Sequence, residues 1–251
     1  MQFQQPSISE AASKEQRAAH FNMQKDATIT ELSPLAEENV EEAAALMALA
    51  FLQSPVYCYI FEGLDEKARL NALAWLFFRN IRLRLSAARC AFDKTSGKMV
   101  CCFMLQSPDA GDIVFWTMLS NGILTLPFLY GWRAFTRLLE VKEFHEKLDN
   151  GVRDELKGRR YAVLERMVVA PSYQGTGVGS RCLHAALSEN AKQGYGVYLT
   201  TQEERNVTFY SRLGFKEVRR DANYPFRKSS SSSSSIIINA VMILEPRSTS
   251  L

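Results

Sequence analysis

The stretch "VVAPSYQGTGVGSRCLHAAL", Val168–Leu187, places three glycines within five residues, at Gly175, Gly177 and Gly179. An apolar, strand-like run precedes these glycines, and a helix-like run follows them. Glycine costs conformational entropy on folding, so the cluster indicates a backbone that adopts unusual dihedral angles or approaches a ligand closely. A helix N-terminus presents unpaired N–H groups and the positive end of its dipole. The pattern therefore predicts an anion-binding loop between a strand and a helix.

Three kinds of site use such a loop. A Walker loop has Lys followed by Ser or Thr after its last glycine, but here Ser180 and Arg181 follow Gly179. A dinucleotide-binding turn has the spacing G-x-G-x-x-G and an acidic residue about 20 positions further on. The spacing here is G-x-G-x-G, and no acidic residue closes the next strand, "VYLTTQ". The third kind of site binds coenzyme A, and the pattern that remains to be explained is Q-x-x-G-x-G at Gln174, Gly177 and Gly179.

Composition narrows the class of protein. The chain has 251 residues, 47% of them hydrophobic, which suits one large domain with a sizeable core. Its 30 basic and 27 acidic residues leave a net charge of only +3, with no long basic block, so we expect no nucleic-acid partner. Five cysteines without a C-x-x-C pair indicate reduced thiols and a cytoplasmic location. They predict neither a disulfide framework nor a metal site.

The order of elements predicts the fold class. Residues 1–27 are expected to be a disordered tail, and 28–246 to form one domain. The hydrophobic pattern along that domain reads β α α β β, a helical insert at about 112–158, then β α β α β β. A hairpin in the first half and a βαβ crossover in the second predict a mixed, mainly antiparallel α/β sheet with helices on both faces. The serine run 229–235 is expected to be a flexible loop within the domain.

The helical insert contains an uncharged segment, Ile113–Trp132. Its length is about that of a bilayer span, but polar residues, glycines and Pro127 interrupt it, so we expect a buried helix-turn segment and no membrane span. A break is expected in the following helix near Asn150-Gly151. Aromatic side chains of the first helices and the insert are candidates for an apolar pocket: Phe51, Tyr57, Tyr59, Phe61, Trp75, Phe115, Trp116 and Phe128.

Two motifs carry a resemblance to a known family. The stretch "MVVAPSYQGTGVGSRCL" resembles the acetyl-coenzyme A motif of the GNAT superfamily of N-acetyltransferases. About 30 residues further on, "NVTFYSRLGF" is similar to the helix that follows in that superfamily, with Asn206, Tyr210, Gly214 and Phe215 at the matching positions. Two motifs in the right order are far more specific than either one alone. The order of elements over 28–246 agrees, and three shorter stretches resemble the puromycin-acetyltransferase-like branch.

The resemblance implies a binding site for acetyl-coenzyme A as co-substrate, with no metal. The glycine loop would hold the pyrophosphate, and the preceding strand would pair with the pantetheine arm. The implied cofactor-binding residues are Met167, Val168, Val169, Gln174, Gly175, Thr176, Gly177, Val178, Gly179, Ser180, Asn206 and Tyr210. The same fold separates this strand from its parallel partner to admit the arm.

The chemistry of acetyl transfer assigns further roles. The amine must be neutral to attack the thioester, and a backbone N–H near Val168 or Val169 would stabilise the oxyanion. Tyr210 resembles the family's proton donor to the leaving thiolate. Glu165 lies nine residues before Gln174, where some members of the superfamily carry a glutamate, and would accept the amine's proton directly or through water. The alternative for Glu165 is a structural ion pair with Arg166 or Arg181. His145 and His184 are interpreted as surface residues of helices.

The sequence therefore predicts an N-acetyltransferase that acts on a primary amine of a small molecule in a ternary complex. A protein lysine or N-terminal acetyltransferase remains an alternative, as do a non-catalytic acyl-coenzyme A-binding protein and a membrane-tethered protein. A homodimer is left open.

Overall fold

A computed structural model of the chain describes residues 28–110, 121–156, 158–221, 226 and 238–246. Its centre is a seven-stranded sheet in the order β1-β2-β3-β4-β5-β7-β6. The strands are β1 (Ser33–Pro34), β2 (Ala88–Phe92), β3 (Met99–Gln106), β4 (Tyr161–Val169), β5 (Gly196–Thr201), β6 (Lys216–Asp221) and β7 (Asn239–Leu244). Only β4 and β5 pair in parallel, which confirms the predicted mixed, mainly antiparallel sheet.

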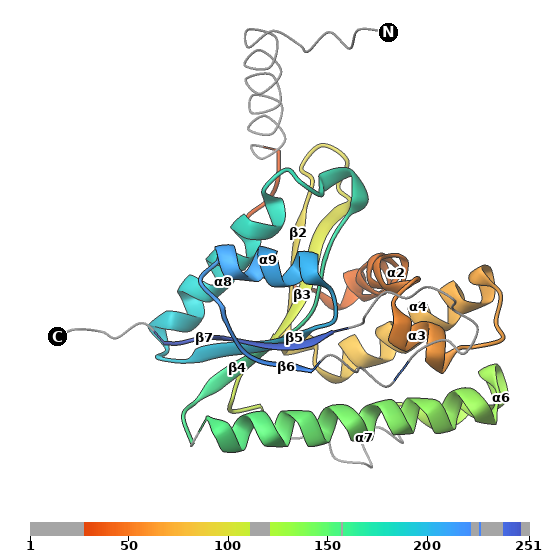
Figure 1. Cartoon of the computed structure of the whole chain (residues 1–251). Helices are drawn as coiled ribbons and strands as arrows, with labels where there is room; N and C mark the ends of the chain where they lie inside the picture. Colours follow the sequence, from red (N-terminus) through yellow and green to blue (C-terminus); the bar gives the residue numbers. More distant parts are fainter. Residues whose placement is uncertain (1–27, 111–120, 157, 222–225, 227–237, 247–251) are drawn as a thin grey trace, which may run out of the picture.

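The helices cover both faces of this sheet (Figure 1). One face is covered by α8 (Val178–Lys192) and α9 (Glu204–Arg212), which pack on Phe103, Leu164 and Leu199. The other face is covered near β2, β3 and the end of β4 by α2 (Val40–Phe51), α3 (Pro55–Ile60) and α4 (Glu66–Leu83). Across β4, β5 and β7 the same face is covered by the long helix α7 (Trp132–Glu155).

Local sequence explains most of the helix boundaries. Asp65 caps α4 by accepting a hydrogen bond from the backbone N–H of Ala68 at 2.7 Å, as its N-cap position predicted. Gly194 and Gly214 follow α8 and α9 with φ of +74° and +92°, which suits glycine at the end of a helix. The short helix α3 was missed, because its six residues are too few to show a helical period.

Helix α7 corrects one expectation. It runs without a break from Trp132 to Glu155, although Gly151 lies inside it. Leu148 and Val152 are almost fully buried against Tyr161, Tyr198 and Val241 of the sheet. This burial offsets the cost of about 1 kcal/mol that glycine imposes inside a helix.

Several expectations lie outside the described residues, namely those for 1–27, for the serine run 229–235 and for Phe115 and Trp116. The described part of Ile113–Trp132 forms short helical turns, Ile123–Thr125 and α6 (Leu126–Tyr130). Among the described residues, none of the helices combines the length and the apolar composition that crossing a membrane requires.

Candidate acetyl-transfer site

The glycine loop connects β4 to α8, as predicted. Gly175 and Gly177 have φ of +74° and +89°, values that favour glycine over any residue with a side chain. Gly177 is the N-cap of α8, whose first turn contains no acidic residue and has no side-chain cap. A Cβ atom on Gly175 or Gly177 would meet no other atom within 4 Å. The space beside these two glycines at the start of α8 is therefore open, and a helix N-terminus with open space beside it suits a pyrophosphate.

Hydrogen bonds hold this loop in place. The Gln174 side-chain amide donates to the carbonyl of Val169 at 3.1 Å, and the Thr176 hydroxyl donates to the carbonyl of Tyr173 at 2.7 Å. The Tyr173 hydroxyl donates to Asp93 at 2.5 Å, which ties the loop to the β2–β3 hairpin. This bond, together with N–H donors from Ser96 and Thr95, lowers the pKa of Asp93 to about 2.

Strand β4 is irregular where it approaches the loop. Glu165 pairs with Met104 of β3 and Val168 pairs with Cys102, so Arg166 and Met167 together face the single residue Phe103. Arg166 has a φ of +51° and is the only non-glycine residue with positive φ in the described chain. The two facts define a β-bulge, a feature that re-aims side chains and is common beside active sites.

The bulge lies beside a fork between β4 and β5. The two strands pair only at Tyr161–Val163 of β4 and Gly196–Tyr198 of β5. Among the described residues, Leu164–Val169 of β4 pair with no strand on the β5 side, so this edge is open except at the Val169 carbonyl, which accepts from Gln174. The predicted separation of the strands is thus present, and an amide-bearing arm has backbone groups to bind there.

The hydrogen-bond pattern identifies which backbone groups face the fork. The N–H of Ala170 donates to Val100 of β3 at 2.8 Å. Because N–H groups alternate in direction along a strand, the N–H of Val168 points to β3 and that of Val169 points to the fork. Of the two residues expected to donate to an oxyanion, only Val169 directs its N–H toward the fork.

Helix α9 brings the second motif to the same place. Tyr210 is 9% exposed and packs against Phe209 and Phe215 at ring-centroid distances of 5.1 and 5.7 Å. Burial, and to a lesser degree the nearby Cys101 thiol, raises the pKa of Tyr210 well above its usual range, so the phenol stays protonated. The Asn206 amide donates to the Thr201 hydroxyl at 3.1 Å and joins α9 to the end of β5.

Glu165 points to the opposite face, toward α4 and α7. Its carboxylate lies 2.8 Å from an Arg166 Nη and 3.7 Å from an Arg84 Nη. The ion pair with Arg166 was expected, whereas the second partner is Arg84 and not Arg181. His145 also lies on this side: burial, followed by the charge of Arg166, lowers its pKa, and Glu165 opposes the shift. His145 is therefore half-buried beside Glu165, and the expectation of a surface histidine was wrong.

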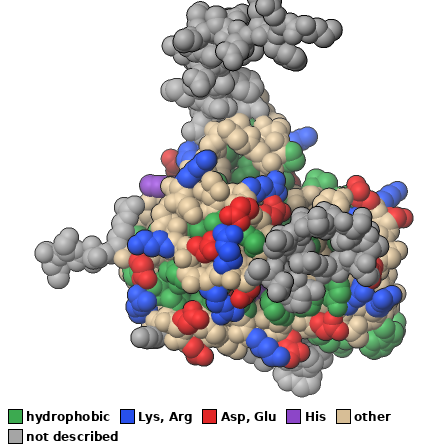
Figure 2. Space-filling view, in the orientation of Figure 1, with side chains coloured by type: hydrophobic (Ala, Val, Ile, Leu, Met, Phe, Trp, Pro, Cys, Tyr) green, Lys and Arg blue, Asp and Glu red, His purple; other side chains and the backbone are tan. Residues whose placement is uncertain are grey.

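Aromatic side chains lie on the same face as Glu165, which the sequence predicted to be the acceptor side. Phe51, Tyr57 and Phe77 form a ring cluster with centroid distances of 5.3 to 5.8 Å, and the Arg166 guanidinium lies 6.0 Å from the Phe77 ring. One expected lining residue is elsewhere. Phe128 is 85% exposed, because Leu126 and Pro127 supply the buried side of the short helix α6. It belongs to an exposed apolar patch with Leu124, Leu129 and Trp132, which Figure 2 shows over α6.

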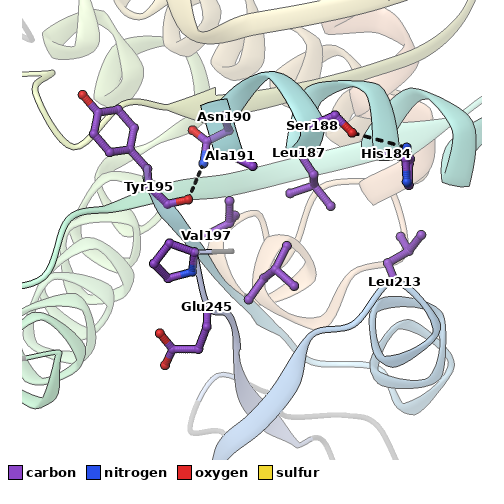
Figure 3. A pocket seen from close by; sticks show the side chains of 11 residues that line it. His184, Leu187, Ser188, Asn190, Ala191, Tyr195, Val197, Leu213 and Glu245 are labelled. Atoms are coloured by element: carbon purple, nitrogen blue, oxygen red, sulfur yellow. Dashed lines mark hydrogen bonds between the residues drawn. The ribbon is translucent and has the colours of Figure 1, made fainter. Parts of the chain in front are cut away.

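A surface hollow lies at the other end of α8 (Figure 3). Leu187, Tyr195, Leu213 and Leu244 line it, and the exposed His184 contacts the Ser188 hydroxyl at 3.5 Å. The hollow is at the start of β5, whereas the glycine loop is at the N-terminus of α8. It is therefore separate from the transfer site, and His184 is the surface residue that was expected.

Comparison with known proteins agrees with this geometry. The sequence model of the acetyltransferase (GNAT) domain matches residues 143–217, which run from the second half of α7 to the start of β6 and include both motifs. This segment is similar to the GNAT acetyltransferase domain. Acetyltransferases of this superfamily use acetyl-coenzyme A, and the open cradle at Gly177 and the fork beside Val169 fit that co-substrate.

Solved structures show the same fold for the domain and its surroundings. A putative arylalkylamine N-acetyltransferase of the yellow fever mosquito is 16% identical, with a TM-score of 0.57, covering 85% of this chain and 86% of that one. A polyamine N-acetyltransferase of Drosophila melanogaster is 11% identical, with a TM-score of 0.55, covering 86% and 99%. A Corynebacterium glutamicum protein described as histone acetyltransferase HPA2 and related acetyltransferase is 15% identical, with a TM-score of 0.56, covering 88% and 98%.

The GNAT domain and this fold support an enzyme of the N-acetyltransferase class. No curated protein matches the chain. Within the described residues, no group of three or more His, Cys, Asp and Glu side chains could hold a metal ion.

Three residues on the face that carries Glu165 had no role in the prediction from sequence. Arg84, Asp149 and Tyr198 come from the end of α4, from α7 and from β5. A signal for Asp149 was present, because His145 and Asp149 share the helical spacing of the buried stripe that contains Val141, Leu148 and Val152. Titratable residues on the apolar stripe of a helix are unusual and indicate a site.

Proposed function

We propose that this protein transfers the acetyl group of acetyl-coenzyme A to the primary amine of a small molecule, by direct attack in a ternary complex. One observation carries the proposal. The bulge at Arg166 and the fork beside it lie between a loop suited to the coenzyme and a side lined with carboxylates and aromatic rings.

The coenzyme would bind along the α8 side. In this proposal the N–H groups from Gln174 to Ser180 hold the pyrophosphate, and Gly179 keeps the loop close to the strand. A Cβ on Gly179 would lie 3.0 Å from a Val169 methyl group and 3.4 Å from the Met167 methyl group. The pantetheine amides pair with the open edge of β4 at Met167–Val169. The N–H of Val169 then stabilises the oxyanion of the tetrahedral intermediate.

The acceptor amine would approach from the face covered by α3, α4 and α7. The ring cluster of Phe51, Tyr57 and Phe77 suits an amine with an apolar or aromatic body. Glu165 binds the ammonium group, and the proton leaves toward the carboxylates of this side directly or through water. Tyr210, protonated because of its burial, donates to the leaving sulfur. No covalent enzyme intermediate is needed, since both substrates are held together.

The similar structures described as arylalkylamine and polyamine N-acetyltransferases support a small amine as the acceptor. The resemblance to the puromycin-acetyltransferase-like branch remains a prediction about the finer class.

The test is a thiol-release assay with acetyl-coenzyme A and a panel of amines. The panel contains arylalkylamines, polyamines, agmatine, aminoglycosides and peptides with a free N-terminus or lysine. We expect release with small amines that carry an apolar body. Release with peptides alone would favour a protein acetyltransferase. Coenzyme binding without release for any amine would leave an acyl-coenzyme A-binding protein.

A further inference from the structure

Asp149 lies on α7 at the level of the fork between β4 and β5. Its neighbour Leu148 is 4% exposed, and Val152, one turn further on, is 1% exposed. Both pack in one cluster with Tyr161, which is in the first paired position of β4 and β5, and with Tyr198, which is in the last paired position before the strands separate. The helix backbone next to Asp149 is therefore fixed against the sheet where the two strands separate.

Charged and titratable groups face Asp149 from every element around it. Glu165 comes from β4, Tyr198 from β5 and Arg84 from the end of α4, while His145 and Arg153 lie one turn away on α7 itself. Tyr198 is 2% exposed, and its hydroxyl lies beside Asp149 and Arg153 without a hydrogen bond of good geometry to either group. A buried hydroxyl without a good hydrogen bond is costly, so a polar group of a ligand or a water molecule is expected beside Asp149.

The two carboxylates of this side differ in their partners. Both oxygens of Glu165 face a guanidinium, one from Arg166 at 2.8 Å and one from Arg84 at 3.7 Å. These contacts engage both carboxylate oxygens of Glu165. The pKa of Asp149 is instead raised to about 6, first by burial and second by the negative charge of Glu165. Arg153, Arg84 and Tyr198 act in the opposite direction.

We infer that Asp149 is the group that receives the proton of the acceptor's ammonium ion, directly or through a water molecule bound at Tyr198. The inference rests on the proposed acetyl transfer and names a catalytic residue for it. Glu165 then positions the ammonium group, and Asp149 accepts its proton.

The proton and electron balance is complete without another reactant. The ammonium nitrogen gives one proton to the Asp149 carboxylate, and its freed electron pair forms the bond to the thioester carbon. When the tetrahedral intermediate collapses, the carbon–sulfur bond breaks and its electron pair goes to sulfur. Sulfur gains a proton from Tyr210, and the second nitrogen proton replaces the one that Tyr210 has lost. Asp149 returns its proton to solvent.

The pH dependence follows from these roles. A base with a pKa of about 6 is ionised at neutral pH, so kcat/KM should rise as the pH increases through about 6. A primary amine has a pKa of about 10 and needs this help throughout the neutral range. Without the base, kcat/KM should instead rise tenfold per pH unit toward the pKa of the amine.

The experiment measures kcat/KM between pH 5 and 9.5 for the wild type and three variants, with one accepted amine. Asp149→Asn should lower kcat/KM by about 10²-fold at pH 7 and remove the step near pH 6. Glu165→Gln should lower activity but keep the step, displaced to lower pH, because Asp149 loses a neighbouring negative charge. Asp154→Asn, the same change at an exposed position of the same helix, should match the wild type.

A second readout is independent of turnover. Carbon-13 NMR of aspartate carboxyl groups should show one resonance with a midpoint near pH 6 that is absent from Asp149→Asn. A step near pH 6 that survives in Asp149→Asn, or that disappears in Glu165→Gln, would overturn the inference. If Asp149→Asn does not fold, the inference is tested by the pH profile of Glu165→Gln, which should keep the step, and by the NMR titration of the wild type, which should show the midpoint near pH 6. Absence of thiol release by the wild type with every amine would contradict the proposed function itself, while the NMR titration would still report on Asp149.

Discussion

Replacing Tyr210 by Phe should slow the release of coenzyme A without disturbing the fold. The ring of Tyr210 is buried against Phe209 and Phe215, and phenylalanine keeps these contacts. Only the hydroxyl is lost, so the variant isolates the proton that the leaving sulfur needs. A single general acid contributes about 10²-fold, so kcat should fall by about that factor, or about 2.7 kcal/mol in activation free energy.

The assay follows thiol release from acetyl-coenzyme A between pH 6 and 9.5 at saturating amine. The deficit should be constant over this range, because burial keeps the Tyr210 phenol protonated throughout. Affinity for acetyl-coenzyme A, measured by calorimetry, should change little. A donor thioester with a more acidic thiol should restore much of the rate, because a better leaving group needs less help.

Tyr195→Phe is the matched control. It removes a phenol whose hydroxyl bonds Asp109 at 2.8 Å and which lines the hollow at the far end of α8, so its rate should match the wild type. A Tyr210→Phe variant as fast as the wild type across the pH series would refute the reasoning, and the acid would be another group or water.

Three further changes test the loop and its supports. Gly177→Glu should abolish coenzyme A binding in calorimetry with the circular dichroism spectrum retained, because a carboxylate would occupy the open cradle at φ +89°; unchanged affinity would remove the assignment of the loop. Asp93→Asn should destabilise the protein above about pH 5, as measured by urea unfolding. The difference from the wild type should shrink as the pH falls toward 2, because the pKa of Asp93 is lower in the folded than in the unfolded protein. A difference in stability that does not depend on pH would contradict this. Gly151→Ala should stabilise the protein by about 0.5–1 kcal/mol, since the nearest atom to a Cβ there is 3.8 Å away; a loss of stability would mean that α7 needs a break.

The sequence predicted those parts of the molecule that local chemistry determines. The glycine loop, the N-cap of α4 at Asp65 and the strands of the sheet have short-range signals in glycine spacing, capping and hydrophobic periodicity. The two motifs also placed Tyr210 and Asn206 on the helix after β5, where the structure has them.

The acceptor side depends on tertiary contacts and was predicted only in part. Nothing local indicates that Arg84, at the end of α4, reaches Glu165 of β4, because the pairing arises from how the helix lies on the sheet. The break expected at Gly151 did not occur, since the burial of Leu148 and Val152 outweighs the local preference of glycine. Phe128 gave an apolar signal, yet the position of Leu126 and Pro127 directs it outward.

In the proposed reaction, the acetyl group passes directly from coenzyme A to an amine bound beside the fork. Its most direct test is a single-turnover experiment in which the protein, acetyl-coenzyme A and an accepted amine are mixed, quenched within milliseconds to seconds and analysed by mass spectrometry. Direct transfer predicts that acetylated amine and free coenzyme A appear together in equal amounts, with the protein mass unchanged at every time point. An acetylated protein that forms before the product, or free coenzyme A without acetylated amine, would contradict it.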